Sequence, residues 1–164
     1  MTKRVLLITD SQERTLITES ILARADCVIS ARLSHKDDWF RNVGESDAVF
    51  FALEKSTPEI LNGIRRISYE HPIPVVMFVD LGDEPSVEAA IQAGVSAYVV
   101  DGFGGQRTIR IRAILSAAIA RFNAMRALQL ELDKVRARLR EYKKNETSEA
   151  REIIQPDYIQ DNIH

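Results

Sequence analysis

Short apolar segments alternate with longer segments of helical periodicity along the chain through residue 106. The apolar segments are rich in β-branched and aromatic residues, which favour strands, and turn or loop residues separate most of them. Five of these segments are predicted to be strands, at residues 4–10, 27–33, 47–53, 74–80 and 96–102. Several are apolar almost without interruption, which is typical of central parallel strands that are covered on both faces.

The segments between these strands carry apolar residues at helical spacing. Two are predicted to be helices with one apolar face each: residues 12–24, with Leu16, Ile17, Ile21 and Leu22, and residues 57–69, with Ile60, Leu61, Ile64 and Ile67. Ser56 or Thr57 is the expected N-cap of the second helix, and Pro58 lies in its first turn. Gly94 is expected to end a further helix, whereas residues 35–44 define a helical face less clearly. The alternation predicts an α/β fold with a doubly wound, five-stranded parallel sheet.

The last helical pattern continues without glycine or proline from about residue 108 to Arg140 and beyond. Positions spaced alternately by three and four residues form a stripe that is apolar except at Arg121, where Phe122 is adjacent: Ile111, Ile114, Ala118, Arg121, Met125, Leu128, Leu132, Val135, Leu139 and Tyr142. This spacing is the heptad seam of a left-handed coiled coil. At about 1.5 Å per residue the seam would be about 48 Å long, so its distal half needs a partner helix. A parallel homodimer is the simplest solution, and the antiparallel alternative stays open.

The pattern divides the chain into three parts. Residues 1–120 are predicted to form the α/β domain, and residues 108–144 an extended helix that dimerises as a coiled coil. Residues 145–164 turn polar and are predicted to be a flexible tail with at most one weak helical turn before Pro156.

Composition and charge narrow the class of protein. The 164 residues are 45% apolar and carry a net charge of -2, which is too small to attract nucleic acid or a membrane to the chain as a whole. The single cysteine, Cys27, cannot form an intramolecular disulfide, and the first residues lack the pattern of a signal peptide. No apolar run approaches the roughly 20 residues of a membrane span. We therefore expect a cytoplasmic protein without a membrane partner.

One cluster of basic residues contrasts with the small net charge of the whole chain. Six basic residues, opposed within their span by Glu141, lie close together: Lys134, Arg136, Arg138, Arg140, Lys143 and Lys144. Such a cluster attracts phosphates in a salt-dependent way, so RNA is an alternative partner. A solvated flank of the coiled coil is the simpler interpretation, because Tyr142 on the seam is the only aromatic residue among them.

Three segments resemble the receiver domain of two-component response regulators. They are RVLLITDSQER at the first strand, PVVMFVD at the fourth, and AAIQAGVSAYVVDGF, which has the A-x-x-A-G-x-x-x-Y pattern of that family. The resemblance covers about residues 4–120 and implies the flavodoxin-like strand order 2-1-3-4-5. A working receiver uses two carboxylates to hold Mg²⁺, an aspartate nucleophile, and a hydroxyl and a lysine that contact the phosphoryl group.

Carried over position by position, the resemblance implies a degenerate phosphorylation site. Thr9 and Asp10 replace the acidic pair and Ala52 replaces the nucleophile. Val79 stands at the hydroxyl position, unless the loop is shifted to Asp80, and Asp101 stands at the lysine position. We therefore predict a pseudo-receiver that is not an enzyme and needs no cofactor. A conventional phosphorylatable receiver remains the alternative if the alignment at Ala52 is wrong, with Glu54 as the only shifted acceptor.

Two further features of this site concern Tyr98 and the acidic residues after the strands. The aromatic residue that receivers use as a conformational readout corresponds to Tyr98, although a side chain that simply fills the sheet edge is the simpler interpretation. Asp10, Asp80 or Asp83, and Asp101 are expected near one another at the carboxyl ends of the strands. We predict solvated loop carboxylates there, and no metal site.

The segments VVMFVD, AGVSAYVVDG and AIARFNAMRALQLELDKVRARLRE resemble the nitrate-assimilation branch of the ANTAR-type antitermination regulators. In that family a coiled-coil dimer carries an RNA-binding module that a ligand-sensing partner restrains. The resemblance implies a non-catalytic regulator that acts through a protein partner and dimerisation. The family's output pattern R-K-x-I-x-x-A-K-G has only a faint echo after residue 144, so we expect the ANTAR module to be absent or truncated.

Overall fold

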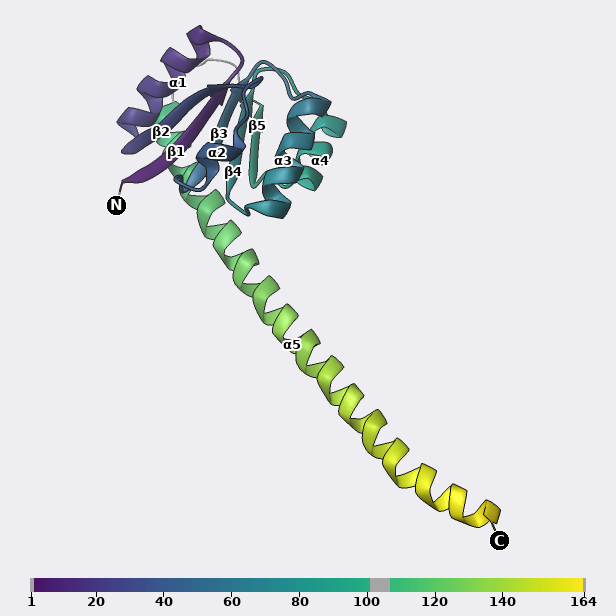
Figure 1. Ribbon diagram of the computed structural model, residues 1–164. Helices are drawn as coiled ribbons and strands as arrows, with labels where there is room; N and C mark the ends of the chain where they lie inside the picture. The colour runs from purple at the N-terminus through teal and green to yellow at the C-terminus, as the bar shows by residue number, and fades with distance from the viewer. Residues whose placement is uncertain (1, 101–106, 164) are drawn as a thin grey trace. The chain divides into compact units, whose positions relative to one another are not determined.

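A single five-stranded parallel sheet forms the centre of the fold in this computed structural model, which describes residues 2–100 and 107–163 (Figure 1). The strand order is β2-β1-β3-β4-β5, so the predicted doubly wound sheet is confirmed. The strands are β1 (Lys3–Thr9), β2 (Cys27–Ser34), β3 (Ala48–Leu53), β4 (Val75–Val79) and β5 (Ala97–Val100). Every residue of β3 and β4 is buried, as their continuous apolar runs require.

Within the described residues, a helix follows each of the five strands. The helices are α1 (Gln12–Arg24), α2 (Phe40–Val43), α3 (Pro58–Glu70), α4 (Glu84–Ala93) and α5 (Arg107–Ile163). Among the described residues, none of these helices combines the length and the apolar character that spanning a lipid bilayer requires.

Each face of the sheet has its own hydrophobic core. One core joins the sheet to α2, α3 and α4 and includes Trp39, whose ring lies edge-on to Phe51 with 5.1 Å between the centroids. The other core, called the second core below, joins the opposite face to α1 and to the beginning of α5, through Leu22 and Leu115 among others. The core that contains Trp39 is called the first core. Both faces are therefore covered, which leaves the strand ends as the place where polar groups meet.

Helix ends follow the expected chemistry at two places. Thr57 caps α3 by accepting a hydrogen bond from the backbone N–H of Ile60, with Pro58 in the first turn. Gly94 ends α4 in the left-handed conformation with φ of +115°. The helix expected within residues 35–44 is confined to the four residues of α2.

The predicted apolar face of α1 is wrong at one position. Leu16 is 63% exposed, whereas Thr18 is buried together with Leu22. The amphipathic pattern of α1 is weak, so packing against the sheet selected a face that the apolar spacing did not indicate.

The structure differs from the sequence prediction at both ends of the heptad stripe. Ile111 and Ala118 are buried in the chain's own second core, so they have no surface for a partner, and Ile114 is half-buried against the same core. At the other end α5 continues to Ile163, beyond the predicted end near residue 144. No glycine or proline occurs between residues 145 and 155, so no residue there is a strong helix breaker. The chain divides into two compact units, residues 1–123 and 124–164.

Candidate functional site

The carboxyl ends of β1, β3 and β4 meet at one edge of the sheet, where the predicted site positions lie. Thr9 pairs with Ala52 across β1 and β3, and Leu53 pairs with Val79 across β3 and β4. The structure therefore brings Thr9, Ala52 and Val79 together, because the carboxyl ends of parallel strands meet at one edge of the sheet. Asp101 lies outside the described residues.

Ala52 offers no nucleophile at this edge. Its side chain is 5% exposed and packs in the second core with apolar residues of β1 and β4. The shifted alternative, Glu54, follows the end of β3 and is exposed. Glu54 contributes a backbone N–H to the site instead, and this N–H donates to Asp10 Oδ2 at 2.8 Å.

The centre of the site is a guanidinium group held between two carboxylates. Arg14 Nε lies 2.8 Å from Asp10 Oδ1, and Arg14 Nη1 lies 2.5 Å from Asp80 Oδ2. The three side chains are largely withdrawn from solvent, with exposed fractions of 15% for Arg14, 23% for Asp10 and 24% for Asp80. The contact with Asp80 is a charge-assisted hydrogen bond, which in such surroundings is stronger than one at a surface, whereas the contact with Asp10 Oδ1 is an ion pair without regular hydrogen-bond geometry. The arrangement pairs both carboxylates with one positive charge of the same chain.

Arg14 was missed by the sequence analysis, although one signal for it was present. Asp10 lies just before the N-cap of α1 and Arg14 lies in its first turn, four residues later, a spacing at which opposite charges can pair. Asp80, however, is 66 residues from Arg14 in sequence, and only the meeting of β1 and β4 strand ends brings the two together.

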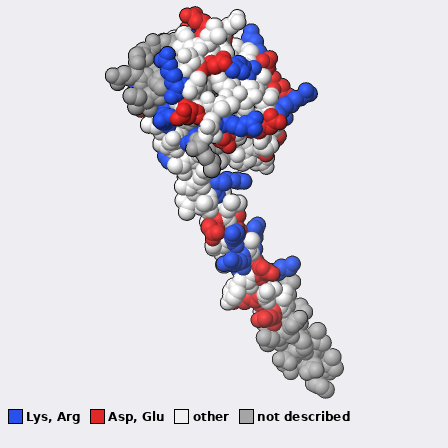
Figure 2. Space-filling model, turned by 90° about the vertical axis from the view of Figure 1, so that its left-hand side faces the viewer, with Lys and Arg blue, Asp and Glu red and all other residues white. Residues whose placement is uncertain are grey.

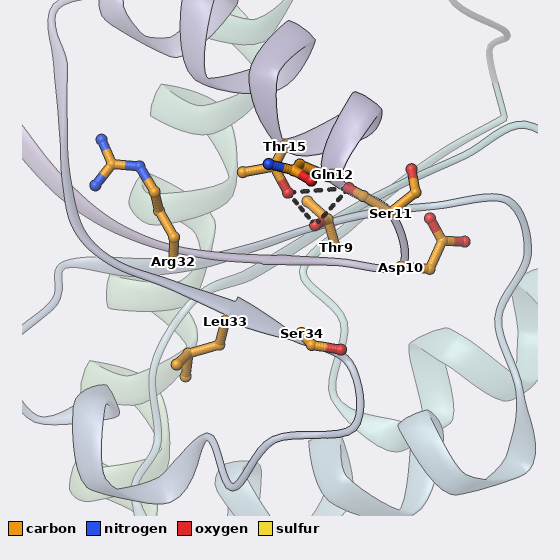
Figure 3. A pocket seen from close by; sticks show the side chains of 8 residues that line it. All are labelled: Thr9, Asp10, Ser11, Gln12, Thr15, Arg32, Leu33 and Ser34. Carbon is orange, nitrogen blue, oxygen red and sulfur yellow. Dashed lines mark hydrogen bonds between the residues drawn. The ribbon is translucent and has the colours of Figure 1, made fainter.

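A group of hydroxyls occupies the other side of the β1 end. Thr9 is 4% exposed, and its Oγ1 lies 2.5 Å from Thr15 Oγ1. Both hydroxyls are within hydrogen-bond distance of the Ser11 carbonyl oxygen, at 3.2 and 3.0 Å. Figure 3 shows this triangle of contacts, with the Asp10 carboxylate directed away from it. Thr9 thus uses its single polar group inside the fold, where a second metal-binding carboxylate would be needed.

A shallow pocket of about 330 Å³ lies beside these hydroxyls (Figure 3). Its lining is Thr9, Asp10, Ser11, Gln12, Thr15, Arg32, Leu33 and Ser34. Arg32 forms an ion pair with Glu19 of α1, so the basic group at this pocket is already engaged. Within the described parts of the chain, no cluster of three or more His, Cys, Asp or Glu side chains is placed to hold a metal ion.

Val79 at the end of β4 and Tyr98 in β5 both pack against the first hydrophobic core, the one that contains Trp39. Val79 is 1% exposed and packs in the first core, where it offers no hydroxyl. Tyr98 packs partly buried against the same core. Burial raises the pKa of the Tyr98 phenol and the nearby Ser56 side chain opposes that rise, although no hydrogen bond of regular geometry joins the two hydroxyls.

Asp83 has a structural task and does not join the acidic group. Its carboxylate accepts a hydrogen bond from the Ser86 backbone N–H at 2.9 Å and caps α4. The hydrogen bonds from Ser86 lower the pKa of this carboxyl group. Of the predicted acidic residues described in the structure, only Asp10 and Asp80 converge.

The distal part of the predicted heptad stripe is exposed on α5. Six of its side chains are between 43% and 69% exposed: Met125, Leu128, Leu132, Val135, Leu139 and Tyr142. Phe122 is half-buried. A continuous apolar stripe of this size is typical of an interaction surface.

The six basic residues from Lys134 to Lys144 are all exposed. Lys134 forms a surface ion pair with Glu131 at 3.4 Å, with both side chains well exposed. Figure 2 shows Lys and Arg side chains interspersed with Asp and Glu along α5.

No protein-family model matches the chain, and no curated protein matches it. Solved structures of receiver domains do match its fold. The response regulator domain of Thermotoga maritima CheB has a TM-score of 0.54 and 17% identity, over 75% of this chain and 98% of that domain. A CheY-like receiver domain protein from Methanospirillum hungatei has a TM-score of 0.61 and 12% identity, over 76% and 99% of the two chains.

NtrX from Brucella abortus has a TM-score of 0.62 and 20% identity, over 79% of this chain but only 29% of NtrX. At these identities the likeness establishes the fold. The chain therefore has the receiver fold of response regulators, a five-stranded parallel sheet in the order 2-1-3-4-5.

Proposed function

We propose that this chain is a non-catalytic signalling regulator, a pseudo-receiver that works without phosphorylation. It acts by binding a protein partner and by dimerising through α5, in a cytoplasmic transcription antitermination system of the ANTAR type. The ligand-sensing component of that system is the expected protein partner. Antitermination rests on the sequence resemblance from β4 to the end of the heptad stripe.

The observation that carries the proposal is the ion-paired position of Arg14. Its guanidinium lies between Asp10 and Asp80 and supplies a permanent positive charge at the edge of the sheet where Thr9 pairs with Ala52, the position of the receiver nucleophile. A receiver that transfers phosphate needs those carboxylates free to ligate Mg²⁺. Here both carboxylates already bind a cation of the same chain. The conformation of the domain is then fixed by the fold instead of being switched by phosphate.

The exposed stripe on α5 supports the second half of the proposal. Six partly exposed apolar side chains at heptad spacing gain free energy when a second helix covers them. The stripe gives the molecule a means of assembly that does not depend on the strand-end site.

The test is incubation with Mg²⁺ and acetyl phosphate, followed by intact mass measurement, with an active receiver in the same mixture as the positive control. We expect no phosphoryl adduct on the native chain. We also expect none on the Ala52→Asp variant, because Thr9 supplies no second carboxylate, Val79 supplies no hydroxyl and Arg14 competes with the metal. A phosphoryl adduct on the native chain would overturn the proposal.

RNA binding by α5 is the second candidate function. It is favoured by Arg136, Arg138 and Arg140, which are exposed and for which no ion pair is found in the described part of the chain. The test is a gel shift with RNA across a salt series, comparing the native chain with a variant in which these three arginines are changed to glutamine. Binding that weakens steeply with salt and disappears in the variant supports the candidate, and equal binding by both removes it.

A further inference from the structure

The exposed apolar stripe on α5 has a symmetry that bears on how two copies associate. Its six residues are spaced 3, 4, 3, 4 and 3 apart, so the pattern reads the same from either end. When two such helices run antiparallel about the midpoint between Asp133 and Lys134, every stripe residue meets a stripe residue of the second copy. The layers are Met125 with Tyr142, Leu128 with Leu139, and Leu132 with Val135.

The residues that end the stripe distinguish the two possible directions. Arg121 occupies the next seam position before Met125, and Glu146 occupies the next one after Tyr142. Both lie on α5 and both are exposed. In a parallel pair Arg121 meets Arg121 of the second copy and Glu146 meets Glu146, so each end places like charges together. In the antiparallel pair each Arg121 meets a Glu146, and both ends are closed by opposite charges.

The positions that flank the seam agree with this direction. In the antiparallel pair Glu131 lies beside Arg138 of the second copy, twice by symmetry. In a parallel pair the attraction of Glu131 for Arg136 is offset by the repulsion between Arg138 and Lys143, each also twice. In the same register Arg136 lies beside Gln129 of the second copy, again twice by symmetry, so this flank pairs a charged side chain with a neutral one. The two copies of Arg136, like the two copies of Glu131, are offset by five residues, or about 7.5 Å along the axis, and these exposed charges are screened by salt.

We infer that α5 forms an antiparallel coiled coil with a second copy of this chain, centred between Asp133 and Lys134. The inference rests on the proposed function, because it specifies the partner and the direction of the dimerisation proposed there. The apolar symmetry of the stripe supplies the register, and the charged ends supply the direction.

Distances between spin labels on two single-cysteine variants test the direction. Both variants carry Cys27→Ser, which removes the buried native thiol. In the antiparallel dimer the labels on Asn145→Cys are 23 residues apart along the axis, or about 35 Å at 1.5 Å per residue. In a parallel dimer they lie side by side. Asp133→Cys is the matched control, because its labels lie side by side in both directions.

The expected result is a short distance for Asp133→Cys and a distance of about 35 Å or more for Asn145→Cys. Short distances for both variants would overturn the antiparallel direction and leave dimerisation standing. If neither variant gives a dipolar signal and native mass spectrometry gives a monomer, both this inference and the proposed dimerisation fail.

A charge-reversal cycle, read out as the dimer Kd, independently tests the contacts between Arg121 and Glu146 at the ends of the stripe. In the antiparallel dimer, Arg121→Glu alone or Glu146→Arg alone raises the dimer Kd about tenfold, because two attractive contacts become repulsive. The double variant restores the native Kd to within about threefold. In a parallel dimer each reversal only exchanges one like-charge contact for another, so unchanged Kd values for the single variants would contradict the inference.

Discussion

Replacing Arg14 by methionine removes the guanidinium from the strand-end site and keeps an apolar side chain of similar length. In the native fold this group contacts Asp10 at 2.8 Å and Asp80 at 2.5 Å. The variant leaves two carboxylates in a partly buried site without that cation. Asp10 still accepts the backbone hydrogen bond from Glu54, so this carboxylate loses only part of its stabilising contacts. We expect the folded domain to be destabilised.

The magnitude follows from the burial of the three groups. Removing one partner of a fully buried ion pair costs about 3–5 kcal/mol, whereas exposed pairs contribute about 0–1 kcal/mol. Arg14 is 15% exposed and its two partners are about a quarter exposed, which places this site between these limits. The free energy of unfolding should therefore fall by about 2–3 kcal/mol. With a urea slope of about 2 kcal/mol per molar, the unfolding midpoint moves down by about 1 M or slightly more.

The assay is urea unfolding followed by the fluorescence of Trp39. This residue is the only tryptophan of the chain and is buried in the first core, so its signal reports on the domain and not on the distal part of α5. Arg112→Met is the matched control, because Arg112 pairs with Asp26 at the surface, where the side chains are 56% and 74% exposed. We expect the control to change the free energy of unfolding by less than about 1 kcal/mol.

A second variant separates charge from packing. Adding Asp80→Asn to Arg14→Met removes one of the two unpaired carboxylates at nearly constant shape and should recover part of the lost stability. The reasoning is refuted if Arg14→Met unfolds at the native urea concentration, or if its destabilisation is no larger than that of Arg112→Met.

Two further predictions concern the domain core. Gly94→Ala should lower the free energy of unfolding by more than about 1 kcal/mol, because φ is +115° and the added Cβ would lie 2.0 Å from Ser68 Oγ. Gly44→Ala is the control in the same urea assay, because its Cβ would approach His71 no closer than 3.6 Å. Burial raises the pKa of the Cys27 thiol above that of the unfolded chain, so the folded state binds this proton more tightly, and stability should fall as the pH rises above about 8.5. Urea midpoints at pH 7 and 9.5 should differ less in Cys27→Ala than in the native chain. An equal change of midpoint between the two pH values in both proteins would contradict this.

The sequence predicted the elements well where the apolar period was strong. Helix α3 has a clear apolar face and a Thr-Pro start, and all four predicted face residues are buried. Helix α1 has a weak pattern, and there the exposed Leu16 and the buried Thr18 reversed the expectation. The difference is physical, because the free energy of packing on the sheet decides the buried face when the intrinsic pattern is nearly balanced.

The residue types of the candidate site were predictable from the sequence, whereas its contacts were not. That Ala52 offers no side-chain oxygen and Val79 no hydroxyl follows from their residue types near the ends of β3 and β4. The role of Arg14 could not be read in the same way, since its contact with Asp80 joins residues 66 positions apart. The capping role of Asp83 likewise depends on the local backbone at the beginning of α4.

The sequence by itself determined the order of strands and helices, the residue types at the strand ends, including Ala52 and Val79, and the heptad spacing of the last helix. These depend on residue type and on periodicity along the chain. Only the tertiary structure decided that Arg14 lies between Asp10 and Asp80, and that Ile111 and Ala118 belong to the chain's own core. A parallel sheet gathers the ends of strands that are distant in sequence, and packing against the sheet decides which part of an apolar stripe is left for a partner.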